Sequence, residues 1–206
     1  MSHAASSTME QESPDGSFDF GAASSGKIGM WVFLLTDAMS FGGMLLSYGI
    51  LRSGSHHWPD PSLRLGIPFT AFMTFVLICS SLTMVMALAA AQKKDKKGAV
   101  TFLALTVLGG LFFLGGQAFE YHHLITEKGM GMSVDQMSST FFLTTGFHGL
   151  HVFTGVTYLT VILLQTMAGK YTDGPNASAN NIEVAGLFWH FVDLVWILVF
   201  TFIYLI

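Results

Sequence analysis

Two apolar stretches decide the fold: FFLTTGFHGLHVFTG at residues 141–155 and GLFWHFVDLVWILVFTFIYLI at residues 186–206. Each lies in an apolar run that can cross a bilayer, which takes about 20 residues of helix. Each also carries two ionisable side chains three positions apart, namely His148 and His151, and His190 and Asp193. A charged side chain at the bilayer centre costs about 2.5 kcal/mol or more unless it is paired or faces the protein interior. The pattern therefore predicts a helical membrane bundle with these residues inside it.

The composition agrees with a membrane protein. Hydrophobic residues make up 51% of the chain and charged residues only 11%, and the mean hydropathy is +0.56. These values are far from those of a soluble domain, and the chain has no basic surface for a nucleic acid. Cys79 is the single cysteine and lies in an apolar run, so neither a disulfide framework nor a thiolate metal cluster is expected.

Five segments are long and apolar enough to span a membrane, so the predicted fold is all-α with five transmembrane helices. Residues 1–26 have neither a basic nor an apolar region of the kind found in signal peptides, and they are predicted to form a mobile polar tail. The membrane domain is expected to occupy residues 27–206. The predicted spans are Ile28–Ile50, Leu65–Ala91, Ala99–Phe119, Phe141–Ala168 and Val184–Ile206.

The basic residues predict the orientation of these spans. An odd number of spans puts the two termini on opposite sides, and retained positive charge marks the cytoplasmic side. With the N-terminus inside, six basic residues lie inside and three outside, which favours an N-in, C-out topology. The inside set is Lys27, Lys93, Lys94, Lys96, Lys97 and Lys170, and the outside set is Arg52, Arg64 and Lys128.

Three ionisable residues are predicted to lie near the bilayer midplane. At a rise of about 1.5 Å per residue, Asp37 and Asp193 are about 14 Å deep from one face, and His151 is about 15 Å deep from the other. Hydrocarbon offers no hydrogen-bond partner, so such residues are expected to pair with one another or to line a wet cleft. We expect Asp37 close to His148 or His151, with either a static hydrogen bond or proton handling as its role.

Several interpretations of the histidines remain open. His148 and His151 could bind a metal together with His190 and a carboxylate, or a haem could lie between His151 and His190. Alternatively, all three are structural histidines held by hydrogen bonds, with His190 and Asp193 forming a buried polar pair. The last interpretation predicts that the chain holds no transition metal.

Residues near the span ends are candidates for contacts with water, lipid headgroups or other subunits. Glu120 closes the third predicted span, where its carboxylate could reach interfacial water or a basic side chain. Glycine pairs such as Gly42/Gly43 and Gly109/Gly110 are expected to let helix backbones approach closely. The candidates for interfacial or subunit contacts are His122, His123, Trp58 and Trp189, and Tyr121 and Tyr204 join the two tryptophans in a predicted aromatic belt.

Three motifs, in this order along the chain, resemble subunit III of haem–copper terminal oxidases: GQAFEYHHL at 116–124, GFHGLHVFTG at 146–155 and FWHFVDLVWILVFTFIYL at 188–205. The resemblance extends from Lys27 to residue 206. It implies a non-catalytic, multi-pass subunit of the bacterial inner membrane that docks on the catalytic subunit I, with subunit II and a small subunit IV as further partners and a supercomplex as a possible setting. Haem and copper would belong to the partner subunits, whereas this chain would hold phospholipid, aid oxygen access and sustain proton uptake.

Two departures from the family pattern matter. Longer members have seven spans, so this chain resembles the short bacterial form and part of its lipid cleft would come from another subunit. The first span carries TDAMSF, which puts Asp37 where short members often have a glutamate, and the electron donor, cytochrome c or quinol, stays open. The competing function is a proton-coupled transporter with Asp37, His151 and Asp193 along its path. A membrane diiron oxidase and a di-haem cytochrome are further alternatives.

Overall fold

The computed structural model describes residues 25–55, 58–60, 64–173 and 178–206, so the predicted tail at 1–26 lies almost entirely outside the described residues. Within these ranges the chain forms five helices that are long and apolar enough to cross a membrane. The helices are α1 (Ser25–Gly54), α3 (Ile67–Gln92), α4 (Lys96–Thr126), α5 (Gln136–Met167) and α6 (Asn180–Val199), and a π-helical segment, η1 (Phe200–Leu205), continues α6. The all-α prediction is confirmed.

Two helices extend well beyond their predicted ends because polar residues cap them. The Asp95 carboxylate accepts a hydrogen bond from the Gly98 amide and starts α4. The Asp135 carboxylate does the same for the Ser138 amide and starts α5 five residues before the predicted Phe141. An N-cap carboxylate satisfies backbone donors that would otherwise lack a partner at a helix start. α4 also continues to Thr126, so Glu120 lies inside the helix and the prediction that it closes the span is wrong.

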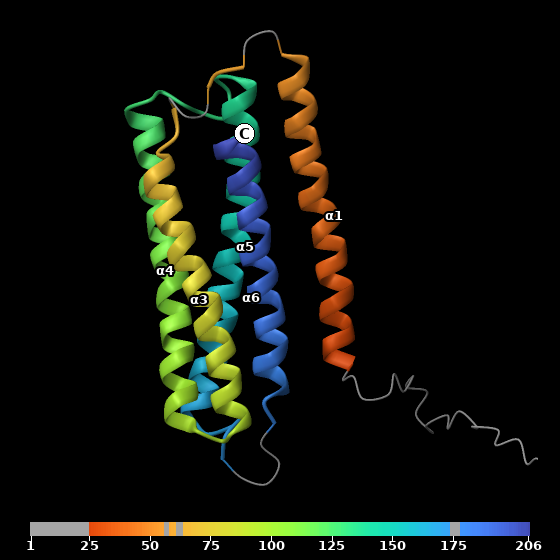
Figure 1. The fold of residues 1–206 in the computed structure, drawn as a ribbon, viewed down its shortest axis with the longest axis vertical. Helices are drawn as coiled ribbons and strands as arrows, with labels where there is room; N and C mark the ends of the chain where they lie inside the picture. The colour runs from red at the N-terminus through yellow and green to blue at the C-terminus, as the bar shows by residue number, and fades with distance from the viewer. Residues whose placement is uncertain (1–24, 56–57, 61–63, 174–177) are drawn as a thin grey trace, which may run out of the picture.

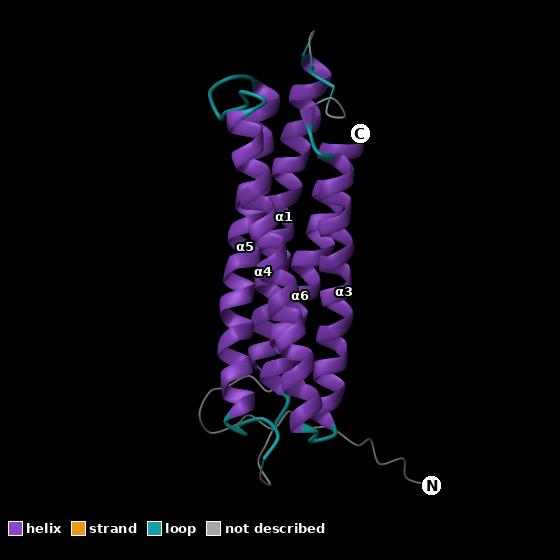
Figure 2. Cartoon of the chain, turned by 90° about the vertical axis from the view of Figure 1, so that its left-hand side faces the viewer, coloured by secondary structure: helices purple, strands orange, loops and turns teal. Residues whose placement is uncertain are grey.

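The helices run up and down in alternation, with their loops at the two ends (Figure 1). α3, α4, α5 and α6 form a four-helix group, and α1 packs along one side of it, mainly against α5 and α6 (Figures 1 and 2). α1 buries a narrow stripe, whereas most of its large side chains are exposed. The buried stripe consists of Leu34, Asp37, Phe41 and Tyr48.

Two buried tryptophans tie α6 to α3. The indole of Trp189 donates to the Ser80 hydroxyl at 3.1 Å, and the indole of Trp196 donates to the Thr74 hydroxyl at 2.9 Å. Trp189 and Tyr204 are 0% and 2% exposed, so the prediction that they belong to an interfacial aromatic belt is wrong. Their polar atoms find partners inside the bundle instead of at its surface.

Some of the glycines mark close helix approaches, as predicted. A Cβ on Gly110 would lie 2.5 Å from a Val156 methyl and 2.6 Å from the Trp189 ring. The prediction is wrong for Gly42 and Gly43, where a Cβ would meet nothing within 4 Å. These two glycines lie on the exposed side of α1.

Ion pairs lie at both ends of the bundle. Lys27 pairs with Glu183 at 2.7 Å and Lys96 with Asp173 at 3.1 Å at the end where α1 begins. The hydrogen bond from Lys96 holds the pKa of Asp173 below its usual value. Arg64 pairs with Asp135 at 2.6 Å at the opposite end. The basic residues assigned to opposite sides thus lie at opposite ends, while the N-in, C-out orientation stays a prediction.

Asp135 should make the stability of the α4–α5 loop depend on pH. Partial burial acts to raise the pKa of Asp135, but the hydrogen bonds from Ser138 and Arg64 outweigh it, so the pKa lies below its usual value. The ionised carboxylate therefore adds stability above about pH 4, the unfolded-state value, and loses it as pH falls through the folded-state pKa. We expect Asp135→Asn, which keeps a capping oxygen, to cost about 1 kcal/mol or less at pH 7 and nothing near pH 2. Thermal unfolding of both proteins across this range tests it, and a deficit that persists at pH 2 would contradict it.

Candidate functional site

Asp37 on α1 and His151 on α5 form a hydrogen-bonded pair inside the membrane domain. The His151 Nε2 atom lies 3.1 Å from the Asp37 Oδ1 atom, and the two side chains are 13% and 7% exposed. The other ring nitrogen, Nδ1, lies 2.8 Å from the Phe147 carbonyl oxygen on the same helix. The predicted closeness of Asp37 to His151 is confirmed.

The geometry defines how this pair can hold its proton. A carbonyl oxygen only accepts, so Nδ1 of His151 carries a hydrogen and donates it to Phe147. The bond between Nε2 and Asp37 then contains one further proton, which belongs either to the carboxyl group or to the imidazole. Both arrangements are neutral overall, which suits a buried site. Asp37 and His151 can therefore exchange a proton without creating net charge in the membrane.

His148 lies one helical turn before His151 but in different surroundings. It is 0% exposed, and within the described residues neither ring nitrogen has a hydrogen-bond partner. Its ring packs against Trp196, at 4.8 Å between centroids, and against the edge of Phe113, at 5.7 Å. The prediction that His148 is held by hydrogen bonds is wrong, because aromatic packing fixes this ring instead.

His190 and Asp193 do not form the predicted pair. The His190 Nδ1 atom hydrogen-bonds to the Ser81 hydroxyl on α3 at 2.5 Å. Asp193 is 5% exposed, and in the described part of the chain no group makes a hydrogen bond of normal geometry to either of its oxygens. Ser81 of α3 lies close to Asp193, but its hydroxyl is engaged by His190. No hydrogen bond or ion pair joins Asp193 to Asp37 or His151 among the described residues, so the three residues predicted at the midplane do not form one network there.

Glu120 is the centre of a second buried polar group. Its two carboxylate oxygens accept hydrogen bonds from the Thr70 hydroxyl of α3, at 2.9 Å, and the Tyr204 hydroxyl of η1, at 3.1 Å. Glu120 is only 4% exposed, so it does not reach interfacial water as predicted. This group joins three parts of the chain far apart in the sequence.

No group of three or more His, Cys, Asp or Glu residues in the described part of the chain could hold a metal ion. His151 uses both ring nitrogens, and His190 turns toward Ser81. An axial haem ligand needs a free ring nitrogen facing the iron. The residues therefore fit the structural interpretation of His151 and His190 better than a ligand role.

The other contact candidates lie at the end of the bundle where α4 ends. His122 is exposed, and His123 pairs with Glu127 at 3.2 Å on the last turns of α4. Trp58 is partly buried, and its ring stands edge-on to Tyr48 at 5.3 Å. His122, His123 and Trp58 are thus placed where a partner could reach them. Trp189 is not, because it is fully buried.

Sequence reasoning missed the hydroxyl residues that hold the buried polar groups. The sequence gives little indication of these residues, because serine and threonine are common in membrane helices and mostly hydrogen-bond to the backbone of their own helix. Which of them faces a histidine, a carboxylate or an indole follows only from the packing of α3 against α4 and α6. The missed residues are Thr70, Thr74, Ser80 and Ser81.

Comparisons with known proteins agree with the motifs. The family model for cytochrome c oxidase subunit III matches residues 8–206. The chain is 38% identical over 182 residues to cytochrome c oxidase subunit 3 of Corynebacterium diphtheriae, covering 87% of each protein. It is 33% identical over 178 residues to the subunit 3 of Alkalihalophilus pseudofirmus, covering 86% of this chain and 85% of the relative. It is also 35% identical to the probable subunit 3 of Rickettsia felis, covering 87% of this chain but 68% of that longer protein.

Proposed function

Because the chain belongs to the cytochrome c oxidase subunit III family, we propose that it is the non-catalytic subunit III of a proton-pumping haem–copper oxidase in a bacterial inner membrane. Its role there is to support the catalytic subunit I, through lipid at the protein surface, oxygen access, sustained proton uptake and stability of the complex. Haem and copper supply the oxygen chemistry from the partner subunits.

One observation carries the proposal: the buried ionisable groups of this chain are partnered or enclosed one by one instead of converging on a reaction centre. Asp37 and His151 share a proton between α1 and α5, whereas Glu120 is closed in by Thr70 and Tyr204. Such arrangements stabilise helix packing, and they can buffer protons locally. Among the described residues, none of these arrangements brings together the side chains that would hold a redox metal.

The proton-coupled transporter is the less favoured alternative. It requires Asp37, His151 and Asp193 to line one path through the chain. Asp37 and His151 meet at the α1–α5 contact, while Asp193 belongs to α6 beside Ser81 of α3. A path along these residues would have to cross the closely packed core around Trp189 and Trp196.

The cytochrome c oxidase name of the relatives favours cytochrome c over quinol as the electron donor of the complex. The donor would bind another subunit, with subunits I, II and IV as the expected partners. The exposed His122, the partly exposed His123 and the nearby Trp58 are proposed as contacts at the outer end of the bundle.

Co-purification tests this proposal. An affinity tag on the chain, extracted in mild detergent from its native membrane, should bring down a partner with haem and copper at fixed stoichiometry. The tagged chain freed of its partners should show no haem absorption and no bound transition metal. A colourless preparation without any haem-containing partner would contradict the proposal, and so would one haem per isolated chain.

A further inference from the structure

The end of the bundle where α1 begins carries a surplus of positive charge. α3 and α5 end here, and α4 and α6 begin here (Figure 1). Six lysines at this end are matched by only three carboxylates, which leaves three positive charges uncompensated. The lysines are Lys27, Lys93, Lys94, Lys96, Lys97 and Lys170, and the carboxylates belong to Asp95, Asp173 and Glu183.

This surplus lies mainly on the turn between α3 and α4, residues 93–97, which we call the lysine loop. The three carboxylates already have partners, because two pair with Lys27 and Lys96 and the third caps α4. Lys93 and Lys97 are exposed, and neither forms an ion pair with a described residue. The start of α4 adds partial positive charge at the same place. The lysine loop therefore presents positive charge that the described residues leave unneutralised.

The chain before α1 carries the opposite charge. Residues 1–24, which lie outside the described residues, contain no lysine or arginine. They contain four carboxylates, all within residues 10–19, which we call the acidic segment: Glu10, Glu12, Asp15 and Asp19. The negative charges of the acidic segment thus complement the surplus positive charges at the end of the bundle to which the chain connects it.

The acidic segment is long enough to reach the lysine loop. α6 contacts both α1 and α3, whereas α1 and α3 share few contacts, so α6 lies between them. Neighbouring helix axes lie about 8–10 Å apart, which puts the lysine loop about 20–30 Å from the start of α1. At up to about 3.3 Å per residue, Asp19 can reach about 20 Å from Ser25, and Glu10 about 50 Å. Attachment to α1 also gives the acidic segment an effective concentration in the millimolar range at the loop.

We propose that the acidic segment binds the lysine loop and so ties the start of α1 to the turn between α3 and α4. α1 gains from such a tie, because it buries only a narrow stripe and packs mainly against α5 and α6. A single exposed ion pair is weak, but several pairs on one tethered segment act together. Anionic headgroups could also neutralise the lysine loop, but they would repel the acidic segment. The inference concerns a contact within this chain and does not depend on the proposed function.

Cross-linking of the intact complex tests the contact. A water-soluble carbodiimide joins a carboxylate to a lysine amine as an amide where the two groups touch, and it takes up the released water to become a urea. At low salt, mass spectrometry should find peptides that join the acidic segment to the lysine loop. Raising the salt from about 0.1 M to about 1 M shortens the screening length from about 10 Å to about 3 Å, so these peptides should then be lost.

Two ion pairs at the same end of the bundle are internal controls for this reaction. Lys96 and Asp173 lie 3.1 Å apart and Lys27 and Glu183 lie 2.7 Å apart, so both pairs should cross-link at low salt. If these pairs react while the acidic segment does not join the lysine loop, the proposal is overturned.

The distance between two spin labels tests the same contact without using its charged groups as the reactive ones. The labels are placed on Ser17→Cys and Gln92→Cys, in a chain whose exposed Cys79 is replaced by serine. The proposal predicts one short distance in the intact complex. Neutralising the acidic segment should lengthen and broaden this distance, because eight undocked residues spread over about 15 Å around the start of α1. The neutralised chain carries Glu10→Gln, Glu12→Gln, Asp15→Asn and Asp19→Asn.

Neutralising the lysine loop should lengthen the distance in the same way. Lys93→Gln combined with Lys97→Gln is the test, and Lys128→Gln is the matched control, because Lys128 is an exposed lysine at the opposite end of the bundle. The control should keep the short distance. An unchanged distance in the Lys93 and Lys97 variant would overturn the proposal. Cross-links from the acidic segment to another subunit would overturn it as well. Either failure would leave the co-purification test of the proposed function untouched, since that test does not depend on this contact.

Discussion

Trp196→Ala is expected to destabilise the chain by about 3–5 kcal/mol, the cost of removing a large aromatic side chain from a well-packed core. Trp196 is 1% exposed and lies edge-on to Phe113 at 4.7 Å between ring centroids. Its ring also covers His148, and its indole donates to Thr74. In a bilayer the loss comes from packing, because the residues around the new cavity lose their contact partners.

The measurement is thermal unfolding in detergent together with the amount of chain assembled in the membrane. Trp31→Ala provides the control, because Trp31 lies on α1 and is 61% exposed. It should assemble at a normal level and unfold within a few degrees of the unaltered protein. Equal behaviour of the two variants would show that the centre of the bundle does not depend on Trp196.

Gly110→Ala is expected to be strongly destabilising, because the added methyl group would meet two buried side chains. The new Cβ would lie 2.5 Å from Val156 and 2.6 Å from Trp189. Trp189 is 0% exposed and hydrogen-bonded to Ser80, so its ring cannot withdraw cheaply. Overpacking of this kind costs about 1–3 kcal/mol and sometimes more.

Gly115→Ala separates this clash from the general effect of alanine in a helix. A Cβ on Gly115 meets nothing within 4 Å, so the substitution should be neutral or stabilising by about 0.5–1 kcal/mol. The two variants are compared by thermal unfolding under the same conditions. A Gly110→Ala protein as stable as Gly115→Ala would mean that α4, α5 and α6 are packed less closely there than described.

Hydropathy predicted the number and kind of helices, but not their ends. The last turns of α4 contain Glu120, His122 and His123, which lower the apolar signal although the helix continues to Thr126. The start of α5 depends on the Asp135 cap, a local hydrogen bond that a search for apolar runs ignores. Polar residues inside a helix and capping residues just before one therefore account for the misplaced ends.

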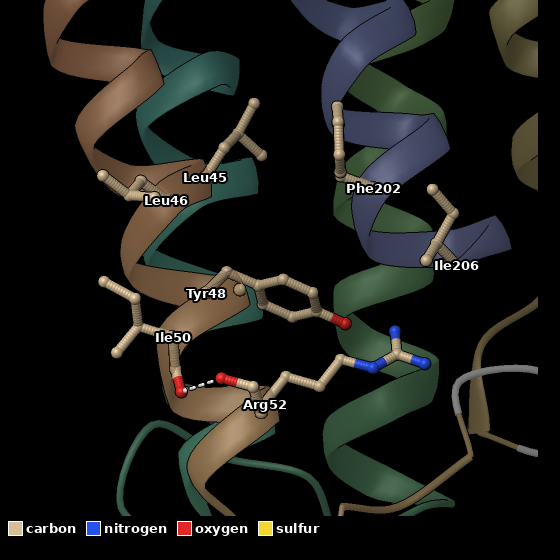
Figure 3. Close-up of a pocket in the computed structure, with 9 residues that line it drawn as sticks. Leu45, Leu46, Tyr48, Ile50, Arg52, Phe202 and Ile206 are labelled. Atoms are coloured by element: carbon tan, nitrogen blue, oxygen red, sulfur yellow. Dashed lines mark hydrogen bonds between the residues drawn. The ribbon is translucent and has the colours of Figure 1, made fainter.

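The Asp37–His151 contact was predictable, because depth in the membrane limits which side chains can hydrogen-bond to each other. Asp37 and His151 lie at similar depth on different helices, and the structure joins them. The estimated depth in the membrane did not predict the partner of His190. Ser81 on α3 is as good a partner as Asp193, and only the packing of α3 on α6 brings Ser81 to His190. The apolar cavity that Tyr48 and Arg52 of α1 line (Figure 3) could not be predicted at all, since Phe202, which also lines it, lies about 150 residues further along the chain.

The central claim is that the buried polar groups of this chain support an oxidase without taking part in its chemistry. Asp37→Asn tests it most directly, because the amide can still hydrogen-bond to His151 but can no longer share a proton with it. Oxygen consumption by the purified complex, followed from the first turnovers until activity is lost, gives the initial rate and the turnover lifetime together. The account predicts an unchanged initial rate and unchanged haem spectra, with any loss confined to faster inactivation. An initial rate that collapses in an intact complex would contradict it and make Asp37 part of an obligatory proton path.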